Sequence, residues 1–127
     1  MLIRHLTGDP PEMAARATKA LADSVELLLA DLIVAECVYV LESFYEVPRE
    51  RVAELMRAAI ALPTIKTLDP ATLLRALEVY EVDRLDFAEA YLVAQAESTG
   101  VQDILSFDRS IDRITTVNRR EALDCPR

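Results

Sequence analysis

Four carboxylates in this chain have positions and spacings that suit a metal site. They are Glu36 inside an apolar run, Asp86 and Glu89 three residues apart, and Asp108 at the end of a second apolar run. Carboxylate oxygens are the ligands that Mg²⁺ and Mn²⁺ prefer in proteins. The sequence has only 1 His and 2 Cys, which argues against zinc. The set therefore predicts Mg²⁺ or Mn²⁺ as the cofactor.

Glu36 is the only charge inside the apolar part of the run DLIVAECVYVLESFY, residues 31–45. This run is apolar on nearly every face of a helix, which predicts a helix buried all round. An ionised carboxylate there is costly unless something pairs with it. The partner is either a metal ion or an Arg or Lys from another helix. A third alternative is a gap in the buried surface through which Glu36 reaches water.

Asp86 and Glu89 lie in RLDFAEAYLVAQA at the start of a predicted helix. Residues three apart project from one face of a helix, so both carboxylates can point toward one metal ion. The same spacing is close to a capping box, in which both residues satisfy backbone donors at the helix N-terminus. The spacing alone favours capping over metal binding.

Asp108 follows the apolar run ILSF, and ligand-binding residues of open parallel sheets collect just beyond the carboxyl ends of strands. Ser106 is two residues earlier on the same strand face, where its hydroxyl can orient a metal or a water. The alternatives are a turn or cap aspartate and an ordinary turn hydroxyl. Asp112 can join the site across one helical turn, although a solvated position is favoured.

The order of predicted elements indicates how these carboxylates are carried. Strands that alternate with helices predict parallel pairing with helices on the sheet faces, and no repeat or linker divides the chain, so we expect one domain over residues 1–127. The helices are predicted at 9–23 (capped by Asp9, with an apolar stripe through Met13, Ala17, Ala20 and Leu21), 31–45, 48–62, 71–80 and 85–98, and the strands at 64–68, 101–107 and 114–117, with 25–30 as a strand or a helix lead-in.

Composition restricts the function further. The net charge of −8 argues against broad capture of nucleic acid, because that affinity comes from Lys and Arg. An acidic protein can still act on phosphodiesters if a bound metal carries the positive charge. No apolar stretch approaches the length of a membrane span, and no secretory signal is evident, so we expect a cytoplasmic protein.

With these elements in order, the chain resembles the PIN-domain family, and in particular the VapC-type ribonuclease toxins of bacterial toxin–antitoxin pairs. The resemblance rests on LIRHLTGDPPE, LIVAECVYVL, LDFAEAYLVAQA and ILSFDRSIDRI, which together span most of the chain. It implies an α/β fold with a short central parallel sheet flanked by helices in three layers. It also implies metal-dependent cleavage of RNA, a cognate antitoxin as partner, and a homodimer.

The resemblance assigns roles to individual residues. Glu36, Glu89 and Asp108 would hold the metal, with Asp86 as a further catalytic acid and Ser106 in support. Glu89 stands where the family usually has Asp, which is one methylene shorter. Arg4, Arg109 and Arg113 are weaker candidates for contacts to RNA phosphates.

The start of the chain departs from the family pattern. Family members normally begin with a strand ending in Asp-Thr-Asn, which carries the first catalytic aspartate of the family. This chain begins at Met1, just after that point, so we expect the given sequence to lack that strand and that metal ligand. We therefore expect the natural protein to be longer, with Met1 a misassigned or internal start, which intact-mass analysis of the native protein tests. The alternative function is a PIN-derived binding module with impaired catalysis that dimerises or sequesters an antitoxin.

Overall fold

The computed structural model describes residues 2–3, 8, 11–23 and 26–121. The chain divides into two compact units, Met1–Leu68 and Asp69–Arg127. Arg4 and the predicted cap Asp9 lie outside the described residues. The expectation of one domain over residues 1–127 remains a prediction.

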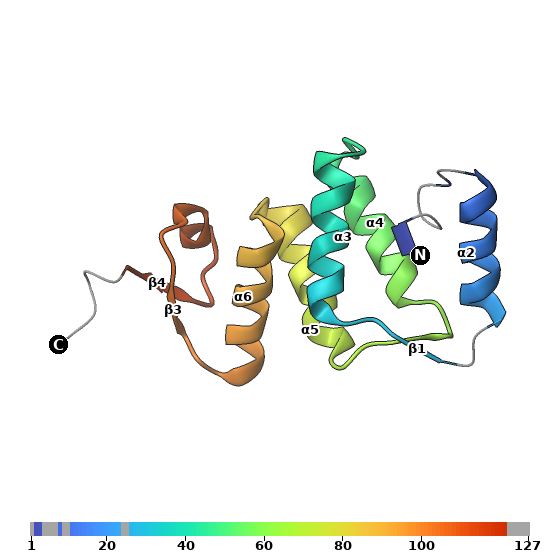
Figure 1. Ribbon diagram of the computed structural model, residues 1–127. Helices are drawn as coiled ribbons and strands as arrows, with labels where there is room; N and C mark the ends of the chain where they lie inside the picture. Colours follow the sequence, from blue (N-terminus) through green and yellow to red (C-terminus); the bar gives the residue numbers. More distant parts are fainter. Residues whose placement is uncertain (1, 4–7, 9–10, 24–25, 122–127) are drawn as a thin grey trace. The chain divides into compact units, whose positions relative to one another are not determined.

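The first unit contains helices α2, α3 and α4 and a pair of short strands (Figure 1). Strands β1 and β2 pair in parallel, with Leu27 opposite Ile65, so the apolar stretch before residue 31 is a strand rather than a helix lead-in. Parallel pairing requires a long crossover, which the intervening helices provide. The elements are α2 (Pro11–Asp23), β1 (Leu27–Leu28), α3 (Asp31–Ser43), α4 (Arg49–Ile60) and β2 (Ile65–Lys66).

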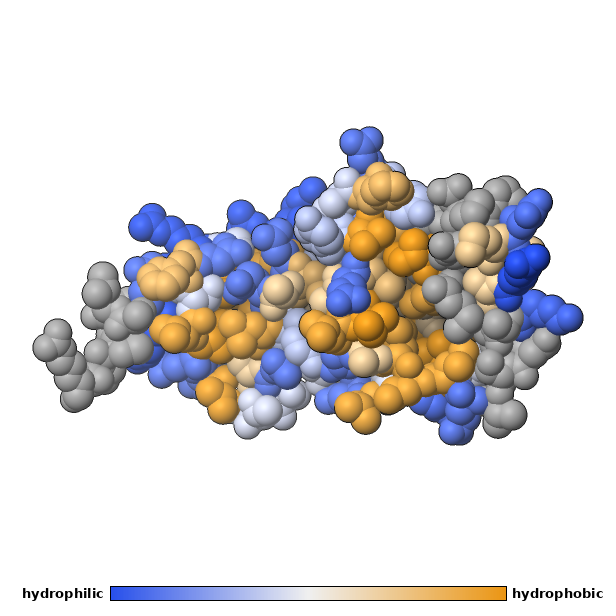
Figure 2. All heavy atoms as spheres, in the orientation of Figure 1, coloured by the Kyte–Doolittle hydropathy of each residue, from blue (hydrophilic) through white to orange (hydrophobic). Residues whose placement is uncertain are grey.

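Helix α3 is buried along one face only, so the prediction of a helix buried all round was wrong. Its buried stripe packs beside α4, while Leu32 is 71% and Tyr39 69% exposed. Figure 2 shows apolar side chains at the surface over α3. An apolar sequence shows that a helix can be buried on several faces, but it does not show how many neighbouring elements pack against it. The buried side chains are Val34, Cys37, Val38 and Leu41 of α3 and Val52, Ala53, Met56 and Ala59 of α4.

Helix α2 also differs from its predicted apolar stripe. Ala14 and Ala17 are buried, whereas Met13 is 44% exposed, so the inclusion of Met13 was wrong. The described buried positions of this helix are thus three residues apart, at Ala14 and Ala17, whereas Ala15 is exposed. The side chains of Ala20 and Leu21, which complete the predicted stripe, lie outside the described ones.

The second unit is a helical hairpin followed by a second strand pair. Asp69 caps α5 by accepting hydrogen bonds from the amide (3.2 Å) and the hydroxyl (2.6 Å) of Thr72. Gly100 ends α6 with a φ of 76°, the left-handed conformation that glycine commonly adopts after a helix. The elements are α5 (Pro70–Glu78), a π-helix (Val79–Asp83), α6 (Phe87–Thr99), β3 (Asp103–Leu105), a 3₁₀ helix (Arg109–Arg113) and β4 (Asn118–Arg120).

The hairpin of α5 and α6 forms the core of the second unit (Figure 1). Tyr80, in the π-helix that extends α5, is fully buried and packs edge-to-face against Phe87 of α6, with 6.2 Å between ring centroids. Arg84 reverses the chain between them with a φ of 62°. Facing helices of this kind give α6 a fixed orientation, so its N-terminal residues are held by the hairpin.

Strands β3 and β4 pair in parallel, with Ile104 opposite Arg119. The predicted strand at residues 114–117 was wrong, because the strand is residues 118–120. Ile114 and Val117 are both buried, three residues apart, in the turn before β4. Helices with short parallel strands confirm the predicted α/β class. In the described residues the strands form two pairs, β1 with β2 and β3 with β4.

Candidate active site

The carboxyl end of β3 brings three of the predicted site residues together. The hydroxyl of Ser106 donates a hydrogen bond to Oε2 of Glu89 on α6, at 3.0 Å. The amide of Asp108 in turn donates to the Ser106 hydroxyl oxygen, also at 3.0 Å. Ser106 is buried and Glu89 is half-buried. One serine therefore links the carboxylate of α6 to the backbone of the strand-end aspartate.

Asp108 also caps the 3₁₀ helix that follows it. Its Oδ1 accepts hydrogen bonds from the hydroxyl of Ser110 (2.6 Å) and from its amide (2.9 Å). These bonds, with smaller effects of Arg113 and Arg119, hold the pKa of Asp108 below its usual value. The cap alternative is thus confirmed for this oxygen. A carboxylate has about four lone-pair sites, so capping leaves acceptor capacity for a ligand.

Asp86 occupies the N-cap position of α6 but makes no side-chain capping bond with the described residues. The capping-box explanation of Asp86 and Glu89 was therefore wrong. Asp86 is exposed, and Glu89 is directed to Ser106. A capping box and a ligand pair have the same spacing, so only the direction of the side chains distinguishes them.

Glu36 lies on the exposed face of α3 in the first unit. The expectation that it is buried was wrong for the physical reason given above for α3. Of the three alternatives for this carboxylate, contact with water describes its surroundings within that unit. Burial therefore does not force Glu36 to find a partner, and its assignment as a metal ligand rests on the family resemblance.

The predicted arginines are exposed, whereas a third arginine, which was not predicted, is hydrogen-bonded to the site loop. Arg109 and Arg113 are exposed, and Nη1 of Arg113 donates to the backbone oxygen of Asp83 at 3.0 Å. Arg119 was not predicted, yet its guanidinium forms hydrogen bonds with Asp112 and with the backbone oxygen of Ser106. Asp112 is 57% exposed, which agrees with the solvated position favoured for it. Side chains alternate between the two faces of a strand, so a correct assignment of β4 to residues 118–120 would have separated Arg119 from its exposed neighbours.

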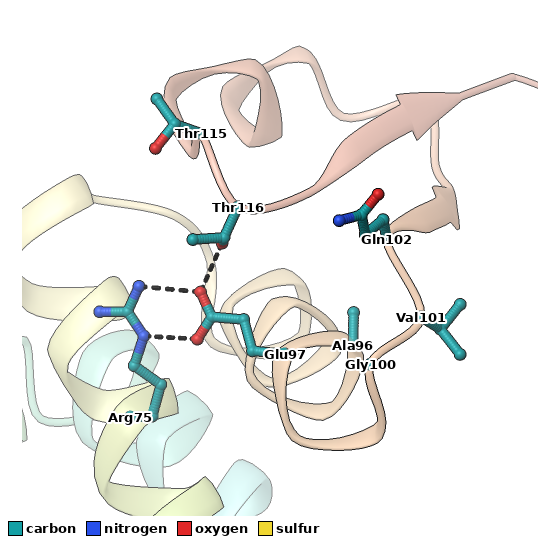
Figure 3. Close-up of a pocket in the computed structure, with 8 residues that line it drawn as sticks. All are labelled: Arg75, Ala96, Glu97, Gly100, Val101, Gln102, Thr115 and Thr116. Atoms are coloured by element: carbon teal, nitrogen blue, oxygen red, sulfur yellow. Dashed lines mark hydrogen bonds and ion pairs between the residues drawn. The ribbon is translucent and has the colours of Figure 1, made fainter.

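A second polar cluster in this unit lies beside a pocket of about 610 Å³ (Figure 3). Arg75 of α5 donates to both carboxylate oxygens of Glu97 on α6, through Nε at 2.7 Å and Nη2 at 3.0 Å. Thr116 donates to the same carboxylate, and Glu78 pairs with the remaining side of Arg75. These groups satisfy one another, so we interpret the cluster as a structural tie between α5, α6 and the turn before β4.

The strand-end residues have the donor chemistry of a magnesium site. Magnesium ions keep several waters and are commonly held by one or two carboxylates, and Glu89 and Asp108 with the Ser106 hydroxyl meet that requirement. Among the described residues, no group of three or more His, Cys, Asp or Glu side chains is close enough to hold a metal. The second unit therefore supplies part of a donor set rather than a closed cage.

The fold is of the α/β class, and in open α/β sheets ligands bind beyond the carboxyl ends of the strands, where Ser106 and Asp108 lie. A family model described as PIN domain matches residues 1–117, so the chain belongs to the PIN domain family. PIN domains are generally metal-dependent nucleases that use divalent ions. No curated protein is significantly similar to the chain. None of the described helices is long and apolar enough to cross a membrane.

Proposed function

We propose that the chain is an endoribonuclease toxin of the VapC type that depends on Mg²⁺ or Mn²⁺ and acts in the cytoplasm. The observation that supports this most is the hydrogen-bonded link from Glu89 through Ser106 to Asp108 at the end of β3, in a member of a family of metal-dependent nucleases. In this proposal Glu36, Glu89 and Asp108 bind the metal, and Asp86 acts beside them.

The metal, when bound, would offset the negative charge of the phosphodiester and activate a water molecule. The protein's own groups prepare the site for it. The Ser106 hydroxyl orients the Glu89 carboxylate, and the bonds from Ser110 keep Asp108 ionised and fixed. Preorganised donors of this kind cost no reorganisation during the reaction.

The net charge of the protein bears on how it would hold RNA. With a net charge of −8, the protein would hold RNA weakly through its own surface, so the metal and a few arginines have to supply the attraction. Arg109 and Arg113 are the described candidates, because both are exposed; Arg109 follows Asp108 directly, and Arg113 lies at the other end of the 3₁₀ helix. On the resemblance to the VapC-type toxins, and not on charge, we also propose a cognate antitoxin that covers this site and a homodimer as the assembled form.

The test is cleavage of structured RNA by the purified chain with Mn²⁺, with and without chelator. Glu36→Gln and Asp108→Asn keep the size of each side chain and remove its charge, so we expect each to lower the cleavage rate by about 100-fold or more. Matched controls are Glu54→Gln in α4 and Asp103→Asn in β3, both on exposed carboxylates.

Three results would overturn the proposal. The first is full activity in both Glu36→Gln and Asp108→Asn. The second is cleavage by the wild-type chain that persists in chelator. The third is a folded wild-type chain that cleaves no RNA with either ion, a result that would support the binding module instead.

A further inference from the structure

Arg119 is a largely buried arginine beneath the loop that carries Asp108. Its side chain is 13% exposed, and it stands on β4 opposite Ile104 of β3. Nε and Nη2 donate to the two carboxylate oxygens of Asp112, at 3.0 and 3.2 Å. Nη1 donates to the backbone oxygen of Ser106 at 3.3 Å and to Glu121 at 2.7 Å.

These contacts bracket Asp108 on both sides. Ser106 precedes it by two residues, and Asp112 follows it by four. A single rigid guanidinium thus ties the start and the end of the loop to the neighbouring strand. Bidentate pairing between Arg and a carboxylate fixes geometry as well as charge, which a lysine ammonium does not do.

Arg119 is poorly suited to bind RNA itself. A guanidinium has five N–H donors, and the four hydrogen bonds above occupy four of them. A phosphate would have to displace Asp112, Glu121 or the Ser106 carbonyl. The arginine is therefore committed to the loop, unlike the exposed Arg109.

We propose that Arg119 is a positioning residue, which holds the loop from Ser106 to Asp112 so that the Ser106 hydroxyl keeps its bond to Glu89 and the Asp108 carboxylate keeps its place at the end of β3. The consequence for RNA cleavage rests on the proposed function, whereas the consequence for loop geometry does not. Arg119 touches neither metal nor RNA in this assignment.

The neighbouring residue Arg120 provides a matched control. It lies on the same strand, its side chain is 47% exposed, and it pairs with the exposed Asp103. Adjacent strand residues point to opposite faces, so Arg120 does not share the loop contacts of Arg119. Arg120→Met therefore removes an arginine from β4 without releasing the loop.

The experiment measures amide hydrogen exchange in the metal-free full chain by NMR. In Arg119→Met and Arg119→Lys we expect the amides of Asp108 and Ser110, which bond to Ser106 and to Asp108, to exchange about three to ten times faster. Amides in α5 and α6 should keep their wild-type rates, as should all of these amides in Arg120→Met. A merely stabilising arginine would instead raise exchange throughout the unit, which would overturn the proposal.

Three further readouts keep the proposal falsifiable. Asp112→Ala removes both acceptors of the same pair from its exposed side, so it should reproduce the local effect even if the Arg119 variants fold poorly. Exchange rates in Arg119→Lys equal to those of wild type would show that a positive charge alone holds the loop. That result would overturn the role of the bidentate guanidinium. In RNA cleavage with Mn²⁺, Arg119→Lys should lower kcat about tenfold or more with KM nearly unchanged.

The two proposals fail in different ways. Faster local exchange in the Arg119 variants, in a protein whose wild type does not cleave RNA, would support the positioning role and overturn the nuclease. Metal-dependent cleavage by the wild type, with unchanged kcat and unchanged exchange in Arg119→Lys, would support the nuclease and overturn the positioning role.

Discussion

The ion pair between Arg75 and Glu97 leads to the most quantitative stability prediction. Glu97 receives two hydrogen bonds from Arg75 and one from Thr116 (Figure 3). The side chain of Arg75 is 33% exposed and that of Glu97 21%, so the pair lies between a buried and a fully solvated one. In Glu97→Gln one oxygen still accepts, but the amide nitrogen faces an N–H donor. We expect the free energy of unfolding to fall by about 1–2 kcal/mol.

The pH dependence of this loss has a definite sign. The pKa of Glu97 lies below its usual value, chiefly because Arg75 donates hydrogen bonds to the carboxylate, and Thr116 adds to the effect. A carboxyl whose pKa is lowered by folding stabilises the folded state above its unfolded pKa of about 4.3 and loses that stabilisation as the pH falls through the folded value. The glutamine of Glu97→Gln does not titrate, so the gap to wild type should narrow in acid.

The assay is urea unfolding followed by circular dichroism, near pH 7 and at about pH 3.5. Glu78→Gln is the control, because Glu78 pairs with the same arginine but is 58% exposed, and its loss should stay below about 0.5 kcal/mol. Equal losses in Glu97→Gln and Glu78→Gln near pH 7 would refute this reasoning. So would a gap between Glu97→Gln and wild type that is the same at both pH values.

Two further predictions concern helix ends. Asp69→Ala should cost about 1 kcal/mol in urea unfolding because it removes the cap on Thr72, whereas Asp86→Ala should cost less than about 0.5 kcal/mol, since Asp86 makes no capping bond with the described residues. Equal losses of unfolding free energy in the two variants would show that Asp86 also caps its helix, contrary to this assignment. Gly100→Ala should cost about 1 kcal/mol by thermal unfolding because Gly100 has a φ of 76°, although an added Cβ would meet nothing within 4 Å. An unchanged midpoint would show that the left-handed cap is unstrained by a side chain.

Helix boundaries were predictable because local chemistry sets them. The Asp69-Pro70 pair starts α5 and Gly100 ends α6 without help from distant residues. Burial was less predictable, since it depends on which elements cover a helix. Glu36 lies in an apolar run yet is exposed, because only one side of α3 faces α4.

The strand-end site was predictable in part, because two of its residues lie close together in the sequence. Ser106 and Asp108 follow an apolar run, and a topological rule places such residues at a ligand-binding edge. Arg119 was missed because Ile114 and Val117 resemble a strand when only their apolarity is considered. They are buried at a spacing of three in a turn, and that turn moves the true strand to residues 118–120.

The two parallel strand pairs also differ in how fast they can form. Leu27 pairs with Ile65 in the first unit, whereas Asp103 pairs with Asn118 in the second, so the first pair closes a loop more than twice as long. The entropy of loop closure grows with the logarithm of loop length, which adds about 0.8 kcal/mol to the barrier for the first pair. Folding rates fall as contacts become more distant in sequence. In a refolding experiment with pulsed exchange labelling, the amides of β3 and β4 should gain protection before those of β1 and β2, and the reverse order would show that chain connectivity does not set the sequence of events.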